Sequence, residues 1–151
     1  MEGRVEVILT GMCAGKTTLE RKLTNYVDMD FFCGVKSRRQ IAIAKRMIEL
    51  YSKEAVEGNY YIFNIDRFEK LELYTIPTIK IKEIVIPIDF EFRKEIFMNR
   101  QDKGDSSFEY FLTHLENNVK LARLYSHKYK VPLHFLKGGE FLYDYFYNQS
   151  V

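Results

Sequence analysis

A glycine-containing loop, placed between a hydrophobic run and a helical segment, constrains this chain more than any other sequence feature. The run from Val5 to Leu9 predicts a buried strand, and the segment from about Lys16 to Asn25 predicts a helix with Leu19 and Leu23 on one face. Between them the sequence reads GMCAG and leads directly into a Lys-Thr pair. In this order, backbone N–H groups of the loop and of the helix start converge on an anion. The sequence therefore predicts a phosphate-binding loop.

Each part of this loop has an expected task. Lys16 would reach the β- and γ-phosphates of a nucleotide, and the Thr17 hydroxyl would bind Mg²⁺. Gly11 and Gly15 would allow positive φ angles and a close approach of the backbone to the phosphates. The residues expected around the phosphates are Gly11, Met12, Cys13, Ala14, Gly15, Lys16, Thr17 and Thr18.

The spacing of the glycines departs from the usual pattern, which is G-x-x-x-x-G-K-[ST]. Counting back from Gly15, that pattern requires a glycine at Thr10, whereas Gly11 leaves only three residues in between. Either the loop is one residue tighter, or Thr10 replaces the glycine. An ordinary strand-to-helix turn with a chance Gly-Lys-Thr is the alternative without function, and the flanking strand and helix argue against it.

Strand and helix patterns alternate along the rest of the chain. Further strands are expected at Tyr26–Phe32, Asn59–Ile65, Ile84–Ile88 and Val131–Leu136. Helices are expected at Ser37–Ala55, Glu91–Asn99 and Ser107–Lys128, with a short aromatic helix ending near Tyr147. The segment Glu69–Lys82 fits either a strand or an extended loop. This order predicts an α/β fold, namely a five-stranded parallel sheet flanked by helices in three α/β/α layers, as one domain over residues 1–151.

Composition narrows the classes of partner. The chain has 151 residues and a net charge of +2, from 23 basic and 21 acidic residues, which argues against nucleic acid as a partner. Cys13 and Cys33 form neither a disulfide framework nor a metal motif, so we expect small buried side chains. The apolar run near the start is too short for a signal peptide or a membrane span, which predicts a cytoplasmic protein without a membrane partner.

Carboxylates follow three of the predicted strands, at the edge where parallel sheets bind ligands. They are Asp28 and Asp30, then Asp66, then Asp89. Phosphoryl transfer needs a carboxylate to hold Mg²⁺ or to take a proton from the acceptor. Asp66 is our first candidate for that role and Asp30 the second, whereas Asp89 best fits a helix cap.

Arginines supply the positive charge that phosphoryl transfer requires. Arg67 follows Asp66, while Arg38 and Arg39 open the second predicted helix. Arg93 and Arg100 lie seven residues apart on one helix face beside the segment QDKGDSS, which predicts a lid over residues 93–107 that folds arginines over the phosphates. For each arginine alone, a solvated surface position is the alternative. The histidines His114, His127 and His134 have no ligand spacing and are expected to be structural or surface groups.

In its phosphate loop, its Asp66-Arg67 pair and its arginine-bearing segment, the sequence resembles the thymidylate kinase and deoxynucleoside kinase branch of the P-loop kinases. The matching segments are GMCAGKTTLERKL, NYYIFNIDRF, and the segment from IVIPIDFEFRKEIF to VKLARLY. The resemblance implies the P-loop NTPase fold, with Asp66 as the catalytic or metal-associated carboxylate. It also implies that Arg67 contacts the acceptor phosphate and that Arg93 and Arg100 are lid arginines. A weaker likeness to guanylate kinases runs through VKSRR and EGNYYIFNIDRFEKL.

These observations predict Mg²⁺-dependent transfer of the ATP γ-phosphate to a small nucleotide, with a (deoxy)nucleoside monophosphate as the best guess. Lys16, Asp66, Arg67, Arg93, Arg100 and Asp30 would be catalytic; Asp30, Arg38, Arg39 and Arg67 would bind the acceptor; and Thr17 and Asp66 would hold Mg²⁺. One alternative is a kinase for a nucleoside or a polynucleotide 5′-hydroxyl, with Asp30 or Asp66 as base. Another is a nucleotide-binding regulatory module without turnover. A homodimer also stays open.

Overall fold

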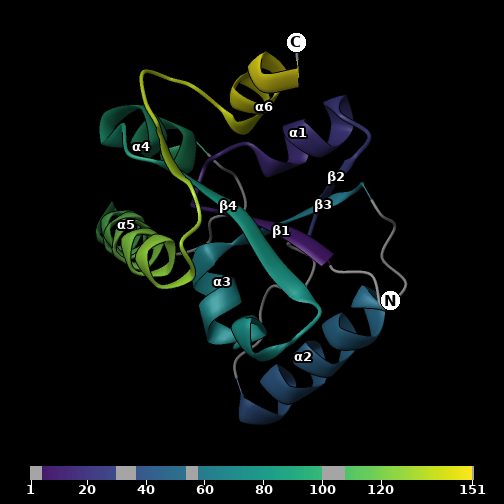
Figure 1. Ribbon diagram of the computed structural model, residues 1–151. Coiled ribbons are helices and arrows are strands. Elements are labelled where there is room, and N and C mark those ends of the chain that lie inside the picture. Colours follow the sequence, from purple (N-terminus) through teal and green to yellow (C-terminus); the bar gives the residue numbers. More distant parts are fainter. Residues whose placement is uncertain (1–4, 30–36, 54–57, 100–107, 151) are drawn as a thin grey trace.

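A five-stranded parallel sheet forms the centre of the protein (Figure 1). The computed structural model describes residues 5–29, 37–53, 58–99 and 108–150. The strands are β1 (Val5–Thr10), β2 (Tyr26–Asp28), β3 (Tyr60–Asn64), β4 (Ile79–Pro87) and β5 (Leu133–Leu136). They lie in the order β2-β3-β1-β4-β5, and every neighbouring pair is parallel. The expected five-stranded parallel sheet is confirmed.

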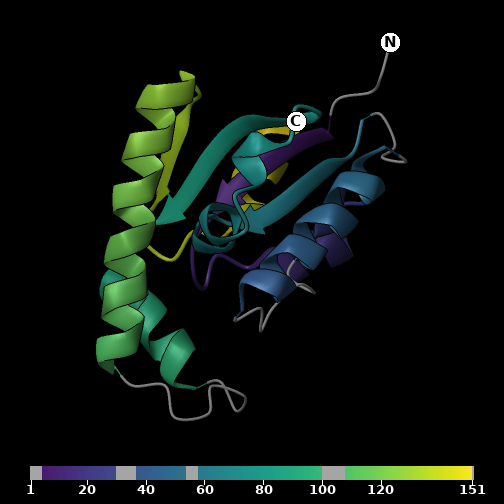
Figure 2. The same cartoon turned by 90° about the horizontal axis from the view of Figure 1, so that it is seen from below.

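Helices cover both faces of this sheet, an arrangement compatible with three α/β/α layers (Figures 1 and 2). They are α1 (Lys16–Lys22), α2 (Arg38–Ser52), α3 (Ile65–Lys70), the 3₁₀ turn η2 (Leu73–Thr75), α4 (Phe90–Met98), α5 (Phe108–Tyr129) and α6 (Leu142–Ser150). On one face, α2, α3 and α5 contribute Ile48, Phe68 and Ala122 to the larger hydrophobic core. On the other face, α1 and α6 contribute Leu19 and Phe146 to a second core.

The alternation of side chains along β1 explains why its sequence is hydrophobic without interruption. Val7 and Leu9 enter the larger core, and Ile8 between them enters the second core. All three side chains are fully buried. A central parallel strand with helices on both faces requires apolar residues on both sides, which is the pattern that the sequence shows.

Two elements differ from the sequence-based expectation. β4 begins at Ile79 rather than Ile84, because the alternating segment before it pairs with β1, starting at Ile79 opposite Val5. The helix α3 was not expected; it begins after Asn64, whose side chain accepts a hydrogen bond of 2.9 Å from the Asp66 N–H. β2 ends at Asp28. Residues 30–32 of the expected strand Tyr26–Phe32 lie outside the described residues.

Side chains mark the ends of two elements. Ser37 caps α2 in a capping box with Gln40, and Pro87 is the last residue of β4. In the sheet, Thr10 lies opposite both Asn64 and Val85. The segments that follow β1, β3 and β4 therefore leave the sheet at the same carboxyl edge, where the candidate site lies.

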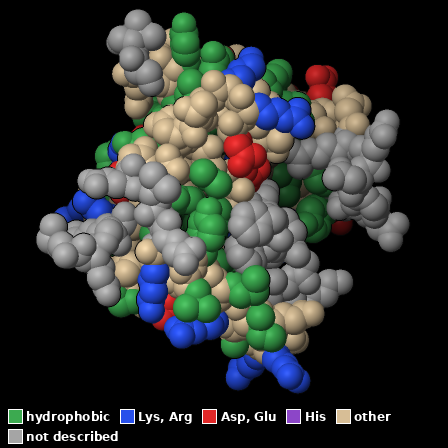
Figure 3. Space-filling model, turned by 90° about the vertical axis from the view of Figure 1, so that its right-hand side faces the viewer, with side chains coloured by type: hydrophobic (Ala, Val, Ile, Leu, Met, Phe, Trp, Pro, Cys, Tyr) green, Lys and Arg blue, Asp and Glu red, His purple; other side chains and the backbone are tan. Residues whose placement is uncertain are grey.

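α2 also carries hydrophobic side chains on its outer face. Ile43, Met47, Leu50 and Tyr51 are exposed, while Ala44 and Ile48 pack into the core. Hydrophobic side chains gather beside Lys and Arg on the lower part of the face drawn in Figure 3, where α2 lies. Across the described ranges, no helix combines the length and the apolar character needed to cross a membrane.

Candidate phosphate-binding site

The predicted phosphate loop connects the central strand β1 to α1, with Lys16 as the first residue of the helix. Gly15, at the cap of α1, has a φ of 91°, and Cys13 has a φ of 62°. A left-handed conformation at a residue with a Cβ costs about 1–2 kcal/mol, so surrounding contacts must hold Cys13 in place. The loop therefore has a defined, locally strained backbone.

Thr10 belongs to the sheet rather than to the loop. Its side chain is fully buried, and its hydroxyl donates a hydrogen bond of 2.7 Å to the Val85 carbonyl of β4. Because the hydroxyl is directed at the neighbouring strand, a threonine at this position leaves the loop interior unobstructed. The five residues Gly11 to Gly15 then form the whole connection between β1 and α1.

The two loop glycines are needed for different reasons. Gly15 has the expected positive φ, whereas Gly11 is not among the residues with positive φ, contrary to expectation. A Cβ on Gly11 would instead lie 2.6 Å from Oδ1 of Asn118, which is too close for any side chain. At Gly11 the constraint is the close approach of α5 to the loop.

Three neighbouring elements hold three consecutive residues of the loop. Asn118 of α5 accepts a 2.9 Å hydrogen bond from the Met12 N–H through Oδ1. Arg93 of α4 donates through Nη1 to the Cys13 carbonyl at 3.1 Å. The Leu142 N–H at the start of α6 donates to the Ala14 carbonyl at 3.0 Å.

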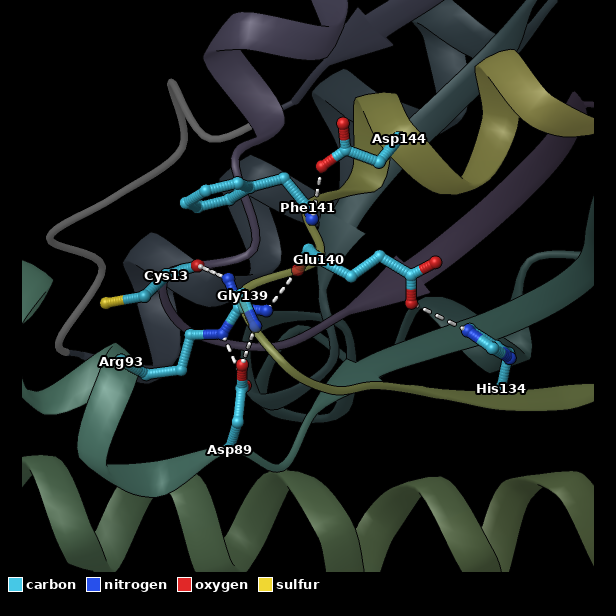
Figure 4. A network of polar contacts seen from close by, with 8 residues as sticks. All are labelled: Cys13, Asp89, Arg93, His134, Gly139, Glu140, Phe141 and Asp144. Atoms are coloured by element: carbon cyan, nitrogen blue, oxygen red, sulfur yellow. Dashed lines mark hydrogen bonds and ion pairs between the residues drawn. The ribbon is translucent and has the colours of Figure 1, made fainter.

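Arg93 is the centre of a buried polar network (Figure 4). Its side chain is 0% exposed; Nε donates to Asp89 Oδ1 at 2.7 Å, and Nη2 donates to the Glu140 carbonyl. The guanidinium also lies over the rings of Phe92 and Phe141, 5.1 and 4.9 Å from their centres. The sequence predicted a lid arginine that folds over bound phosphates. The structure instead places Arg93 in the interior, where it joins the loop to the segment after β5.

Asp89 completes this network and is not a simple helix cap. It lies at the cap position of α4 but makes no side-chain capping bond to that helix. Its Oδ2 accepts a 2.7 Å hydrogen bond from the Gly139 N–H, while Oδ1 accepts from Arg93. The carboxylate therefore links the chain after β4 to the chain after β5.

Asp66 lies in the first turn of α3 and is held by two side chains of α5. Asn117 Nδ2 donates to Asp66 Oδ1 at 2.7 Å, and His114 Nδ1 lies 3.1 Å from Asp66 Oδ2. The His114 ring also contacts the Tyr110 ring, with centroids 4.2 Å apart. Both carboxylate oxygens of Asp66 therefore contact side chains of α5, and the partner of His114 at the candidate site is Asp66.

Asp28 is the carboxylate beside the Thr17 hydroxyl. Thr17 Oγ1 donates to Asp28 Oδ2 at 3.3 Å, and the Asp28 N–H donates to Glu20 Oε1 at 3.2 Å. Two adjacent oxygen ligands of this kind suit Mg²⁺, which takes one or two protein oxygens and completes its shell with water and phosphate. Within the described ranges, no group of three or more His, Cys, Asp or Glu could hold a metal on its own.

The other predicted site residues are the remaining arginines, Asp30 and the expected lid. Arg38 and Arg39 are exposed in the first turn of α2, and Arg67 is half-buried beside Asp66 in α3. Asp30, Arg100 and residues 100–107 of the expected lid lie outside the described residues. Residues 93–98 of that expected lid form most of α4.

Asn118, Asn117 and His114 were missed from the sequence, although one signal was present. Buried residues of α5 recur at spacings of four and three: Phe111, Leu115, Asn118, Ala122 and Tyr125. Asn118 is the polar residue in this apolar stripe, and a buried polar side chain needs a hydrogen-bond partner.

A cavity of about 370 Å³ is not part of the candidate site. Ile79 and Lys80 line it at the amino end of β4, whereas the phosphate loop lies at the carboxyl edge of the sheet.

Comparison with models of known protein families finds no match, and comparison with curated proteins finds none either. The kinase resemblance therefore stays a prediction.

Proposed function

We propose that this protein transfers the γ-phosphate of ATP to a nucleotide, with a (deoxy)nucleoside monophosphate as the best candidate acceptor. The observation that carries the proposal is the anchoring of Met12, Cys13 and Ala14 by α5, α4 and α6. A loop held on three sides keeps its shape before a ligand arrives, so less ordering is required on binding. Such fixed backbone is what a phosphate cradle needs.

Mg²⁺ fits the pair formed by Thr17 and Asp28 better than it fits Asp66. Thr17 Oγ1 and Asp28 Oδ2 are hard oxygen ligands 3.3 Å apart, and Thr17 lies in the first turn of α1 directly after the loop, whereas Asp66 lies in α3. When bound, Mg²⁺ supplies positive charge to the β- and γ-phosphate oxygens. Asp28 therefore replaces Asp66 as the preferred metal carboxylate in this proposal.

The chain's own residues perform the positioning. Lys16 begins α1 directly after Gly15, so in this proposal its ammonium group would meet the phosphates held by the loop. Arg93 acts indirectly, because its hydrogen bond to Cys13 fixes the carbonyl of a strained loop residue. Arg38, Arg39 and Arg67 remain the candidates for the acceptor phosphate.

A kinase for a hydroxyl acceptor is the second candidate function, and the His114–Asp66 pair favours it. A hydroxyl nucleophile loses a proton during phosphoryl transfer, and a histidine oriented by a carboxylate can accept one. His114 Nδ1 lies 3.1 Å from Asp66 Oδ2, so the pair is already formed.

The decisive experiment is ADP release from ATP and Mg²⁺, screened against nucleoside monophosphates, nucleosides and a 5′-hydroxyl oligonucleotide. A monophosphate well above the other acceptors supports the main proposal, and a hydroxyl acceptor supports the second. Lys16→Ala should abolish nucleotide binding without lowering the melting temperature of the free protein. Lys53→Ala, which removes the same charge at an exposed position, is the matched control. ATP binding with no active acceptor would refute the enzyme and favour a regulatory module.

A further inference from the structure

Asn118 combines two features that rarely occur together. Its side chain is 0% exposed, and its Oδ1 accepts the Met12 N–H of the phosphate loop at 2.9 Å. Its Nδ2 is also buried, yet among the residues that the structure describes it has no hydrogen-bond partner. A buried amide donor without a partner is unfavourable, so this position calls for an explanation.

The orientation of the amide follows from the loop. If oxygen and nitrogen of Asn118 were exchanged, two donors would face each other at Met12, because a backbone N–H can only donate. Oδ1 must therefore face the loop, and Nδ2 must carry the unused donors. Exchanging the two terminal atoms of Asn118 would therefore not remove the unpaired donor.

The donor also lies close to the loop. Oxygen and nitrogen of one carboxamide are about 2.2 Å apart by covalent geometry. Because Oδ1 is 2.9 Å from the Met12 nitrogen, Nδ2 lies within about 5 Å of the same atom. Gly11 provides the space, since a Cβ there would lie 2.6 Å from Oδ1. The unpaired donor thus lies beside the main chain of the loop.

We propose that Asn118 Nδ2 donates a hydrogen bond to a phosphoryl oxygen of the nucleotide bound in the loop. This inference rests on the proposed function and adds a phosphate-binding residue from α5, since Asn118 lies 106 residues beyond Met12 in the sequence. One amide then has two tasks, since Oδ1 holds the loop and Nδ2 contacts the ligand. A charge-assisted hydrogen bond of this kind should change ATP affinity about 10- to 100-fold.

The test uses the wild-type chain and the variant Asn118→Asp, with ATP, ADP and adenosine as probes. The variant keeps an oxygen for the Met12 N–H and replaces the donor by an oxygen. Calorimetry should show ATP and ADP affinity reduced at least about 10-fold and adenosine affinity unchanged. Lys120→Ala, on the exposed side of the same helix, is the control and should bind like the wild type.

A second measurement avoids any folding defect of the variant. In the wild type, the side-chain amide protons of Asn118 should shift in the NMR spectrum and exchange more slowly when ATP or ADP is added, but not with adenosine. Unchanged amide signals at saturating ATP, or a folded Asn118→Asp protein with wild-type affinity, would overturn this inference alone. A wild-type chain that binds no nucleotide would overturn the proposed function and this inference with it.

Discussion

Replacing Arg93 by methionine tests the buried network that holds the phosphate loop. The substitution keeps a long apolar side chain but removes the charge and the three donating nitrogens. Asp89 would retain only the Gly139 N–H, and the carbonyls of Cys13 and Glu140 would lose a donor. The Arg93 side chain is 0% exposed and that of Asp89 is 15% exposed, so water can replace little of what is lost.

Removing one partner of a buried ion pair costs about 3–5 kcal/mol, because the other charge stays behind unpaired. A domain of this size has a total stability of about 5–15 kcal/mol, so the loss is a large fraction. For about 150 residues it corresponds to a fall in Tm of roughly 6–20 °C. Asp89→Asn combined with Arg93→Met should cost less than the sum of the single variants, since no charge is left uncompensated.

Urea unfolding followed by circular dichroism measures these free energies. Arg46→Met is the matched control, because Arg46 pairs with Glu49 at 2.9 Å on the exposed side of α2. An exposed pair of this kind contributes about 0–1 kcal/mol. If Arg93→Met lost less than about 1 kcal/mol with an unchanged m value, the network would not stabilise the loop as argued.

Two further predictions concern the metal and the pH dependence. Asp28→Asn should raise the Mg²⁺ concentration needed for half-maximal ATP binding and leave metal-free binding almost unchanged; a Mg²⁺ titration identical to the wild type would contradict it. Burial, together with Tyr60 and Glu83, raises the pKa of Tyr26 to about 12. The folded state then holds this proton more tightly than the unfolded state, so stability should fall as pH rises from 10 towards 12. Tyr26→Phe should reduce that slope in urea unfolding at pH 9 to 11, and an equal slope would argue against the shift.

Much of the fold was predictable because its determinants are local. β1 and β3 were recognised from runs that are apolar on both sides, and Ser37 and Pro87 mark ends by side-chain chemistry. The start of β4 was not predictable, because an alternating segment becomes a strand only when a neighbour pairs with it. α3 has six residues, too few for a periodic pattern.

The candidate site was predictable only where it is contiguous in sequence. The loop from Gly11 to Thr18 could be identified, but its anchors could not. Arg93 is 80 residues from Cys13 and 47 from Glu140, so its sequence neighbours give no sign that it is buried. Asp66 likewise meets His114 from 48 residues away. The charge of a residue is known from the sequence, whereas its hydrogen-bond partners are determined by how the chain packs.

The central place of β1 has a consequence for synthesis of the chain. β1 is made before β3 and β4, the strands with which it pairs, and β4 is complete only about 77 residues after β1. At about 5–20 residues per second, the first strand waits roughly 4–15 s on the ribosome for both neighbours. The loop waits longer, because its anchors Arg93, Asn118 and Leu142 come later still. A nascent chain should therefore acquire its phosphate cradle among the last of its structural features, and its first apolar strand needs protection from aggregation until then.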